Sequence, residues 1–581
     1  MPESHAKPAL CVHLVDLDKL LPHEDISQEI LKKILDEILA DGVFRQAIVV
    51  DRNTNVILDG EHRHAALKLL GCKVIPVIYV DYNSPDVVVQ SWDEGGSLTK
   101  KDVIEAGLSG KRLPPKTSKH MIRDGHVLLH ISAIEETVNL PLSALKNGII
   151  QINMENVKKA MLVDLRDVLP HYARFLSTGI VDTPIIVDEK TNVLLAGYEV
   201  FQALDLLAVE KTPALKVNIK EVEIRSKLYS KTLTWEDILA AGINGPKLPS
   251  NSFEAVVKPL KINILLDDLR KPCEVIDSRT LRVYSSTLEL LFGGWPTPLV
   301  KLNSLSTERR SVWAKLEGYN PFSNSVKDRT GWAMVADALE KGELKEAIYE
   351  ATSTNTGIAI TSIANMLKVK TKLFIPKPVQ KASDTYLKVL GAEVVRLPVE
   401  LTVEAINQVD AEAKAQKATH LNQFENDANF KIHLKTTARE IDEQLKILNL
   451  QPTCIIGGLG TSGHMSAISY YFKTKYGDQV KIVGVQPAPK EVIPGIRRVE
   501  TGMKWFHQAH FDMTVDVRQV EAIESAVNVA RKEGLLIGLS AGAVVHAFQK
   551  VAAEEGVYVL VFPDTGYKYA EQFEKYFTAK H

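Results

Sequence analysis

The sequence lacks several features that would place the protein in a membrane or outside the cell. None of its apolar runs approaches the roughly 18 residues that cross a bilayer. The first residues lack the basic-then-apolar order of a secretory signal. Its four cysteines, Cys11, Cys72, Cys273 and Cys454, form no C-x-x-C pair. We therefore expect a cytoplasmic protein with reduced, buried thiols and neither a membrane segment nor a cysteine-held metal.

An excess of charge of one sign is also missing, because 70 Lys+Arg oppose 72 Asp+Glu. This balance argues against nucleic acid or an anionic membrane as a partner of the whole molecule. The length of 581 residues allows three or four domains, each with its own core.

The first half of the chain contains an internal repeat. The matching pairs of segments are Leu20–Glu24 with Val168–Tyr172, Val49–Gly60 with Ile186–Gly197, Ser97–Gly107 with Thr232–Gly242, and Lys111–Pro114 with Pro246–Pro249. Each copy is predicted to run strand, helix, strand, turn, helix, strand. In the first copy the apolar runs Ala47–Val50 and Lys73–Val80 predict strands, and His62–Leu70 predicts a helix that ends at Gly71.

The two copies differ at polar positions. Glu24, Lys116, Lys119 and His120 align with Tyr172, Asn251, Glu254 and Ala255, and Asp59–Arg63 aligns with Ala196–Val200. Glycine and apolar positions persist, as a shared fold requires. A fold does not require an acid, a histidine and an arginine on one turn, so we infer that the first copy keeps a polar site which the second has lost.

Asp59-Gly-Glu-His-Arg63, at a strand-to-helix junction after the Pro22-His-Glu24 loop, resembles the ParB/sulfiredoxin-like fold. Within that fold it is most similar to the free-serine kinases of archaea and some bacteria. Those enzymes usually read Asp-Gly-His-His-Arg. Here Glu61 replaces the first histidine, which moves the motif toward the Gly-Glu-Arg-Arg box of the ParB partition proteins. The resemblance implies phosphorylation of L-serine by ADP or ATP with Mg²⁺.

The same resemblance implies roles for individual residues. Glu24 would accept the proton of the serine hydroxyl, with Asp59 also in the catalytic group. His62 and Arg63 would offset developing negative charge. Nucleotide contacts would come from Gly60, at the helix start, and from Glu61, Lys116, Thr117, Ser118 and His120. Alternatively, Glu24, Asp59 and Arg63 form a structural ion-pair network. Trp92 would stack on adenine or lie in the core.

The second half contains four polar or glycine-rich segments whose order and spacing are informative. They are Asn320–Arg329, Ala351–Gly357, Gly457–Gly463 and Gly538–Gly542. Together they resemble the pyridoxal-phosphate enzymes of fold type II, which include cysteine synthases, cystathionine β-synthases and threonine synthases. The resemblance covers about residues 285–575. Apolar runs alternate with helical patterns there, as in a doubly wound α/β protein. The predicted strands are Ala347–Ala351, Thr371–Pro376, Cys454–Ile456, Lys481–Gln486 and Val559–Pro563.

This resemblance assigns the cofactor residues by position. Lys327 would form the internal Schiff base with pyridoxal 5′-phosphate and then act as a proton-transfer base. The cofactor phosphate would bind Gly460, Thr461, Ser462, Gly463 and His464. Asn355 would bond the 3′-oxygen. Ser540 would face the pyridine nitrogen, which favours β-elimination and β-replacement. The substrate carboxylate would bind Thr352, Ser353 and Thr354.

Two segments favour phosphate as the leaving group of the substrate. Ile493–Gly502 carries Arg497 and Arg498, and it resembles the same loop of the archaeal O-phosphoserine sulfhydrylases. Gln423–Asn429 matches their substrate-side segment, with Gln423 and Phe424 as candidate contacts. Alternatively, the arginines only pair with surface acids such as Glu500 or Glu491. Acetate, water or thiolate would then be the leaving group.

We therefore predict a multidomain α/β protein with two tandem ParB/sulfiredoxin-like modules, 1–121 and 122–260. A two-subdomain fold type II unit, 261–581, follows and is expected to form a homodimer. The predicted activity is bifunctional: serine and nucleotide give O-phosphoserine, which sulfide converts to cysteine. The first alternative makes the N-terminal half a nucleotide- or serine-sensing module. A second alternative, a ParB-like DNA or CTP binder, is disfavoured because we find neither a helix-turn-helix pattern nor a basic block.

Overall fold

The computed structural model describes residues 11–92, 97–124, 127–227, 232–257, 259–270 and 282–580. The chain divides into two compact units, Met1–Glu274 and Val275–His581. The finer division at residues 121 and 260 stays a prediction. Among the described helices, none combines the length and the hydropathy that a bilayer crossing needs.

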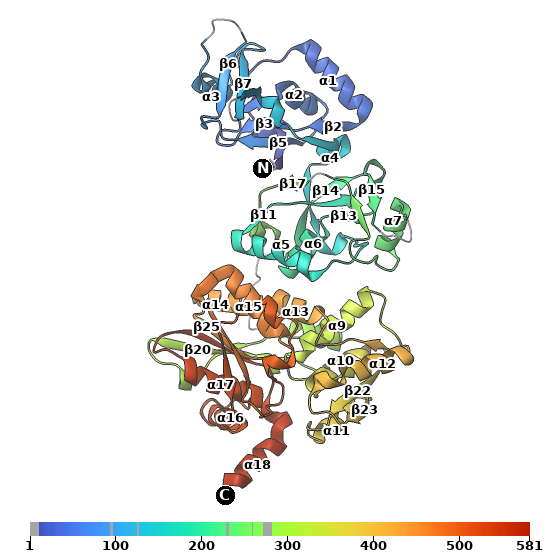
Figure 1. The fold of residues 1–581 in the computed structure, drawn as a ribbon, viewed down its shortest axis with the longest axis vertical. Helices are drawn as coiled ribbons and strands as arrows, with labels where there is room; N and C mark the ends of the chain where they lie inside the picture. Colours follow the sequence, from blue (N-terminus) through green and yellow to red (C-terminus); the bar gives the residue numbers. More distant parts are fainter. Residues whose placement is uncertain are drawn as a thin grey trace, which may run out of the picture. The chain divides into compact units, whose positions relative to one another are not determined.

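The first part of the N-terminal unit is built on a mixed sheet with the strand order β17-β1-β5-β3-β4 (Figure 1). The strands are β1 (Val12–Asp16), β3 (Ile48–Asp51), β4 (Ile57–Asp59), β5 (Val74–Val80) and β17 (Leu260–Lys261). Three helices accompany them: α1 (Gln28–Asp41), α2 (Glu61–Leu69) and α3 (Lys100–Ser109). Smaller sheets pair β6 (Val87–Ser91) with β7 (Ser118–Asp124) and β8 (Val127–His130), and β2 (Val43–Gln46) with β9 (Thr137–Pro141).

The second part repeats this topology. Its sheet has the order β10-β14-β12-β13, with the same parallel and antiparallel pairings as β1-β5-β3-β4. The strands are β10 (Ile149–Asn153), β12 (Ile185–Asp188), β13 (Leu194–Ala196) and β14 (Lys211–Val217), with short β11 (Ile180–Val181), β15 (Ile224–Ser226), β16 (Phe253–Ala255) and β18 (Ile264–Leu265). Its helices are α4 (Leu142–Asn147), which leads in, α5 (Leu165–Thr178), α6 (Tyr198–Leu206) and α7 (Trp235–Ile243). The predicted duplication is therefore also a duplication of structure.

Both copies keep the same buried aspartate at the end of a strand. Asp51 accepts hydrogen bonds from Thr54 N (3.0 Å) and Tyr82 N (3.1 Å). Asp188 accepts from Thr191 N (2.8 Å) and Ile219 N (3.3 Å). A buried carboxylate is costly unless it is satisfied in this way. The shared Val-Asp-x-x-Thr-Asn-Val segment is thus explained by the fold.

The structure corrects one detail of the repeat. Leu20–Glu24 is extended and pairs through Glu24 with Leu113, and the equivalent bridge in the second copy joins Met161 to Leu248. The sequence match had suggested that Tyr172 is the counterpart of Glu24. In the structure Tyr172 lies inside α5, so this alignment is wrong. The short Leu-Pro-His match occurs in an extended segment in one copy and in a helix in the other. Met161 therefore replaces Glu24.

The described residues of the C-terminal unit form two sheets. Its six-stranded sheet has the order β19-β20-β28-β25-β26-β27, and its four-stranded sheet is parallel with the order β23-β22-β21-β24. The strands are β19 (Leu299–Lys301), β20 (Arg310–Leu316), β21 (Ala347–Ala351), β22 (Lys370–Pro376), β23 (Glu393–Leu397), β24 (Thr419–His420), β25 (Cys454–Gly458), β26 (Lys481–Pro487), β27 (Met513–Val517) and β28 (Gly556–Phe562). All five strands predicted here from the sequence are present.

Helices cover these sheets in alternation with the strands, as a parallel sheet requires. They are α8 (Thr287–Gly293), α9 (Lys327–Glu340), α10 (Asn355–Met366), α11 (Ala382–Val389), α12 (Ile406–Ala415), α13 (Ala428–His433), α14 (Arg439–Ile447), α15 (Gly463–Tyr476), α16 (Gln519–Glu533), α17 (Leu539–Val551) and α18 (Ala570–Lys580). Apolar residues of α17 and the central strands of the six-stranded sheet form an extended core cluster. Cys72 and Cys454 are buried as expected, Cys11 is exposed, and Cys273 lies outside the described residues.

Candidate active site

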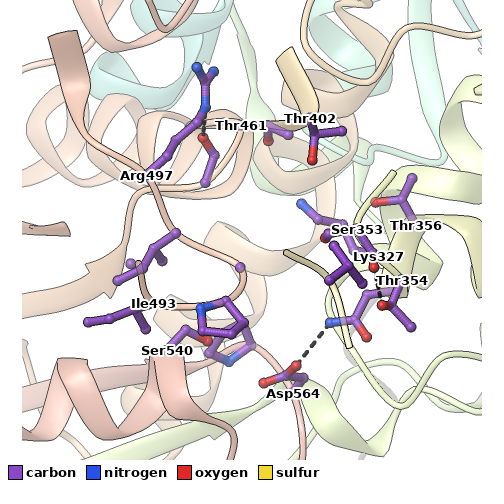
Figure 2. Close-up of a pocket in the computed structure, with 18 of the residues that line it drawn as sticks. Lys327, Ser353, Thr354, Thr356, Thr402, Thr461, Ile493, Arg497, Ser540 and Asp564 are labelled. Atoms are coloured by element: carbon purple, nitrogen blue, oxygen red, sulfur yellow. Dashed lines mark hydrogen bonds between the residues drawn. The ribbon is translucent and has the colours of Figure 1, made fainter. Parts of the chain in front are cut away.

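Lys327 is the first residue of α9, and its amine opens into a cavity of about 190 Å³ (Figure 2). Burial lowers the pKa of Lys327 to about 8, although the nearby Asp564 carboxylate opposes the shift. The preceding loop is held by Asp328, which accepts hydrogen bonds from Phe322 N (2.7 Å) and Ser323 N (2.8 Å). An amine that loses its proton more readily than an ordinary lysine is therefore fixed at a helix start.

The cavity lies between loops that are far apart in the sequence. Figure 2 shows Ser353, Thr354 and Thr402 on the same side as Lys327, and Ile493, Arg497 and Ser540 on the other. Segments 353–356, 376–383, 400–403, 423–424, 458–464, 492–497 and 563–572 contribute its lining. Most of these segments follow the carboxyl ends of parallel strands, which is where open α/β sheets bind ligands.

The glycine-rich segment after β25 forms a tight turn into α15. A Cβ built on Gly460 would lie 2.6 Å from the carbonyl oxygen of Gly495, so only glycine fits there. Ser462 is left-handed, with φ of 70°. Among the described residues, no hydrogen-bond partner is found for Ser462 Oγ or for either ring nitrogen of His464. Unsatisfied polar atoms at a helix N-terminus are what an anionic ligand would meet.

Asn355 sits at the start of α10 and is held from two sides. Its Nδ2 donates to Asp564 Oδ2 (2.9 Å), and Lys568 Nζ donates to its Oδ1 (2.5 Å). Tyr569 Oη donates to the same Asp564 oxygen (2.5 Å). The sequence analysis did not single out Asp564 or Lys568. Their position directly after the predicted strand Val559–Pro563 is the signal that could have found them.

Thr352, Ser353 and Thr354 form the segment predicted to bind the substrate carboxylate, here called the carboxylate loop. In the structure they have two different roles. Ser353 and Thr354 line the cavity, and Thr354 Oγ1 donates to Ser383 Oγ (2.8 Å). Thr352 is buried, and its hydroxyl accepts a hydrogen bond from Gly357 N (3.0 Å). Thr352 thus stabilises the start of α10 and presents no hydroxyl to the cavity.

Gln423 and Phe424 both line the cavity. Gln423 Nε2 donates to Ala351 O (2.8 Å), and its Oε1 accepts from Thr356 Oγ1 (2.7 Å). This amide therefore joins the β21 end to the carboxylate loop. Phe424 packs under the Arg497 guanidinium, with 5.1 Å between its ring centre and Arg497 Cζ.

The two adjacent arginines lie in different surroundings. Arg497 lines the cavity, its Nε donates to Gly460 O (2.8 Å), and its Nη1 donates to Thr501 Oγ1 (2.8 Å). Burial lowers its pKa to about 10, so it stays charged at neutral pH. Arg498 instead pairs with Glu500 (2.9 Å) and Asp516 (3.1 Å). The surface-pair alternative therefore applies to Arg498.

Ser540 is buried at the start of α17 and lines the cavity. A Cβ built on Gly495 would lie 3.7 Å from Ser540 Oγ, so the arginine loop passes close to it. Lys327, Asn355, Ser540 and Arg497 thus surround one cavity, as the sequence predicted.

In the N-terminal unit, Glu24 is oriented by three hydrogen bonds. Its carboxylate accepts from Lys116 N (3.0 Å), Ser118 N (2.5 Å) and Ser118 Oγ (2.5 Å). The Lys116 side chain is exposed, while the Thr117 hydroxyl donates to Pro114 O (2.7 Å). Glu24, Lys116 and Ser118 are therefore brought together as predicted.

Arg63 is enclosed by carboxylates. It pairs with Asp59 (2.6 Å) and with Glu135, which no sequence pattern had indicated. Burial raises the pKa of Asp59, and the neighbouring Glu135 raises this pKa further. This arrangement favours the structural ion-pair alternative for Asp59 and Arg63, because the guanidinium charge is already balanced.

The residues around Gly60 have mixed roles. Gly60 is left-handed with φ of 104°, and a Cβ there would lie 2.4 Å from Ile48 Cγ2. His62 Nε2 accepts from Ser27 N (2.9 Å), and burial lowers its pKa, so it is a neutral group. His120 is buried against Tyr82 Oη (2.9 Å).

Trp92 is 51% exposed and so is not a core residue. Its indole N–H donates to Ser118 O (2.9 Å), and Lys119 Nζ lies 4.8 Å from its ring centre. An exposed aromatic face thus stands beside the segment that orients Glu24. Such a face can stack on a nucleobase.

Comparisons with known proteins concern the C-terminal half. A family model described as "Pyridoxal-phosphate dependent enzyme" matches residues 290–564. The cysteine synthase of Aquifex aeolicus is 35% identical over 291 residues, which cover 47% of this chain and 88% of the relative. Cysteine synthase B of Escherichia coli is 34% identical over 294 residues, covering 49% of this chain and 94% of the relative. The solved structure of an O-ureido-L-serine synthase aligns with a TM-score of 0.46 and 27% identity, over 50% of this chain and 94% of that one.

Proposed function

We propose, from the premise that the chain belongs to the family of pyridoxal-phosphate-dependent enzymes, that it makes cysteine from serine in two steps. The C-terminal part is a domain of the cysteine synthase type, and there sulfide would replace the phosphate of O-phosphoserine. The first N-terminal module, which resembles the free-serine kinases, would form that O-phosphoserine from L-serine and a nucleotide. The observation that carries the choice of substrate is the charged guanidinium of Arg497 at the cavity of Lys327.

The residues present fit pyridoxal 5′-phosphate. Lys327 Nζ would hold its aldehyde carbon, and Asn355 would meet its 3′-oxygen. The backbone at Gly460–Gly463, with Ser462 Oγ and His464, would hold its phosphate, because these polar atoms otherwise stay unsatisfied. Ser540 would face the ring nitrogen. When bound, the cofactor draws electron density from the α-carbon of an amino acid, which allows a group on the β-carbon to leave.

Lys327 is suited to move the α-proton. With its pKa lowered to about 8, a larger fraction of the Nζ amine is neutral near pH 7 than in an ordinary lysine, and this neutral form can accept that proton. Ser353 and Thr354 line the same side of the cavity and would hold the substrate carboxylate. The leaving phosphate would then lie toward Arg497, which faces them from the opposite wall.

Arg497 is suited to a phosphate because its guanidinium is fixed before a ligand binds. Gly460 O and Thr501 Oγ1 hold Nε and Nη1, so that Nη2 can meet an anionic group. The Phe424 ring packs against one face of the guanidinium and so limits its movement. A preorganised, partly desolvated positive charge stabilises a doubly charged phosphate leaving group better than a singly charged acetate.

The proposal for the first module rests on Glu24 and its neighbours. The oriented Glu24 carboxylate would accept the serine hydroxyl proton, while Lys116 and the N–H groups at Gly60 would meet phosphates of ADP or ATP carried with Mg²⁺. Trp92 would stack on the base. Asp59 and Arg63 would position the start of α2 through their ion pairs.

The test uses the full-length, cofactor-loaded protein. L-serine, sulfide and Mg²⁺ are supplied with ADP or with ATP, and cysteine is measured. If the protein makes cysteine from O-phosphoserine but not from serine with either nucleotide, the alternative of a sensing module is favoured. The exposed Trp92 beside Glu24 would provide a binding surface for such a module as well. Cysteine from O-acetylserine but not from O-phosphoserine would refute phosphate as the leaving group.

A further inference from the structure

Four side chains of the first module form one continuous chain of contacts. Glu61 Oε1 lies 2.8 Å from His23 Nδ1. His23 Nε2 lies 2.7 Å from Ser118 Oγ, which donates to Glu24 Oε1 at 2.5 Å. His23 is 1% exposed, so this chain leads from the carboxylate of Glu24 into the protein interior. His23 has no role in the function proposed above.

The atoms around His23 determine where its protons are. Nδ1 donates its hydrogen bond to Ile57 O (2.6 Å) and must therefore carry a proton. Glu61 Oε1 lies 2.8 Å from the same nitrogen as an ion-pair contact, without a hydrogen bond of its own among the described residues. Nε2 is then the atom that can gain or lose a proton. It lies 2.7 Å from the hydroxyl of Ser118, while Glu24 Oε1 is farther away at 3.7 Å. A carboxylate on one ring nitrogen and a hydroxyl on the other is the arrangement that lets an imidazole act as a base.

The second module shows that the fold does not need this chain. The backbone bonds Leu113 N to His23 O and Leu248 N to Ala160 O are both 2.8 Å, so Ala160 is the counterpart of His23. The counterparts of Glu24, Glu61 and Ser118 are Met161, Tyr198 and Phe253. There the rings of Tyr198 and Phe253 pack edge to face at 6.0 Å. An apolar cluster thus occupies the same place in the same topology.

We propose that Ser118 and His23 form a proton relay for Glu24, with Glu61 holding the imidazolium that results; this rests on the phosphoryl transfer proposed for the first module. The serine O–H bond breaks as its oxygen forms a bond to phosphorus and the bond from phosphorus to the nucleotide breaks. The proton goes to Glu24. Glu24 then gives it to Ser118 Oγ while Ser118 gives its own hydroxyl proton to His23 Nε2. After product release the same path returns the proton to water.

The charges that face His23 support this direction of transfer. Burial alone would lower the pKa of His23, but the pair with Glu61 raises it, and Glu24 adds to the effect. His120, with 5.4 Å between the two ring centres, is the third titratable group beside it, and burial lowers its pKa to about 3, so it stays neutral. His23 can therefore accept a proton in a buried place.

The test compares His23→Gln and Glu61→Gln in the full-length protein by measuring phosphoserine formation against pH. Gln at position 23 can still bond Ser118 but cannot take up a proton, so kcat should fall by roughly 100-fold with both KM values unchanged. Wild-type activity should rise with pH through the pKa of His23. Glu61→Gln should move this rise to lower pH, because the imidazolium loses its carboxylate.

His64→Gln is the matched control, because His64 is a buried histidine on α2 that bonds Leu17 O (3.0 Å) outside the chain of contacts. It should keep the wild-type pH profile. An active wild type whose profile is unchanged by Glu61→Gln, or a His23→Gln variant that keeps its kcat, would overturn the relay. A wild type that forms no phosphoserine would instead overturn the proposed kinase. NMR titration of the His23 ring in the wild type and in Glu61→Gln measures the shift of the His23 pKa directly and needs no activity assay.

Discussion

The properties of single residues decide the chemistry of the C-terminal cavity, and Lys327 is the first of them. Lys327→Ala removes the amine that would hold the cofactor, so the visible absorption of the cofactor-loaded protein and its cysteine-forming activity should both be lost. Absorption spectra of the purified variant after incubation with pyridoxal phosphate check this. Lys341→Ala, directly after the end of the same helix and paired with Asp337 (2.8 Å), should keep the wild-type spectrum.

Arg497 provides the second prediction at this scale. Arg497→Met should lower kcat/KM for O-phosphoserine by about 10- to 100-fold, since a hydrogen bond to a charged group is worth roughly 1.5–3 kcal/mol. Its activity with O-acetylserine should change little. Arg498→Met is the control, because Arg498 pairs with Glu500 and Asp516 instead. Equal losses in both variants, or none in either, would contradict phosphate recognition by Arg497.

The resemblance to fold type II enzymes pointed to most of the cavity, because the motifs that carry it are short local segments that follow strand ends and begin helices. Lys327, Asn355, Gly460 and Ser540 lie in segments of this kind. The difference between Arg497 and Arg498 was not predictable, because it depends on Asp516 and Gly460, which are distant in the sequence. Glu135 was missed for the same reason, since its contact with Arg63 joins residues that are 72 positions apart.

At the scale of elements, the N-terminus of α15 should be sensitive to added volume. Gly460→Ala places a Cβ against Gly495 O at 2.6 Å, and neither backbone can yield without moving a wall of the cavity. The variant should therefore bind pyridoxal phosphate more weakly, which a titration of its visible absorption measures. Gly534→Asn, at the C-terminal end of α16, is the control. Gly534 is left-handed with φ of 71° and ψ of 11°, a Cβ added there would meet no atom within 4 Å, and asparagine tolerates that backbone.

A buried charge network joins β20, α9 and α14. Glu440 bonds Arg329 (2.6 Å) and Lys315 (2.7 Å). Burial alone would raise the pKa of Glu440, but these cations lower it to about 2. Glu440→Ala should destabilise the protein by about 3–5 kcal/mol, because Lys315 loses its buried ion-pair partner and Arg329 keeps only Glu317. Denaturant unfolding checks this.

The pH dependence of this network follows from the same shift. A carboxyl whose folded pKa is depressed stabilises the protein above its unfolded pKa, and this contribution is lost as pH falls through the folded value. The part due to Glu440 should therefore persist at pH 7 and disappear between about pH 4.5 and pH 2. Over this pH range the free energy of unfolding of Glu440→Ala should therefore fall less than that of the wild type. An equal acid dependence in both proteins would contradict the argument.

At the scale of the whole molecule, the two proposed activities should be separable by one substitution. Glu24→Gln removes the acceptor of the hydroxyl proton, so cysteine formation from serine, nucleotide and sulfide should fall by at least about 100-fold. Cysteine formation from O-phosphoserine and sulfide should be unchanged. Both rates are measured on the same preparation, and His64→Gln serves as the control. Loss of both activities would point to a general folding defect.

The sequence predicted the duplication of the first half and the mixed α/β character of the second, because both leave periodic apolar patterns. It placed the repeat wrongly at Leu20–Glu24, since a match of a few residues carries no information on whether they are extended or helical. The domain boundaries, the homodimer and the cytoplasmic location stay predictions.

The pairing of β17 with β1 determines how this protein can be cut into pieces. Val12 pairs with Leu260 in a parallel ladder, so the edge of the first sheet is completed by residues that come after the second module. A fragment ending at residue 121 would leave that edge bare, and it would also lose β9 and Glu135. Bare strand edges invite association with other chains. A workable fragment of the first module must therefore extend past Lys261 and carry both copies.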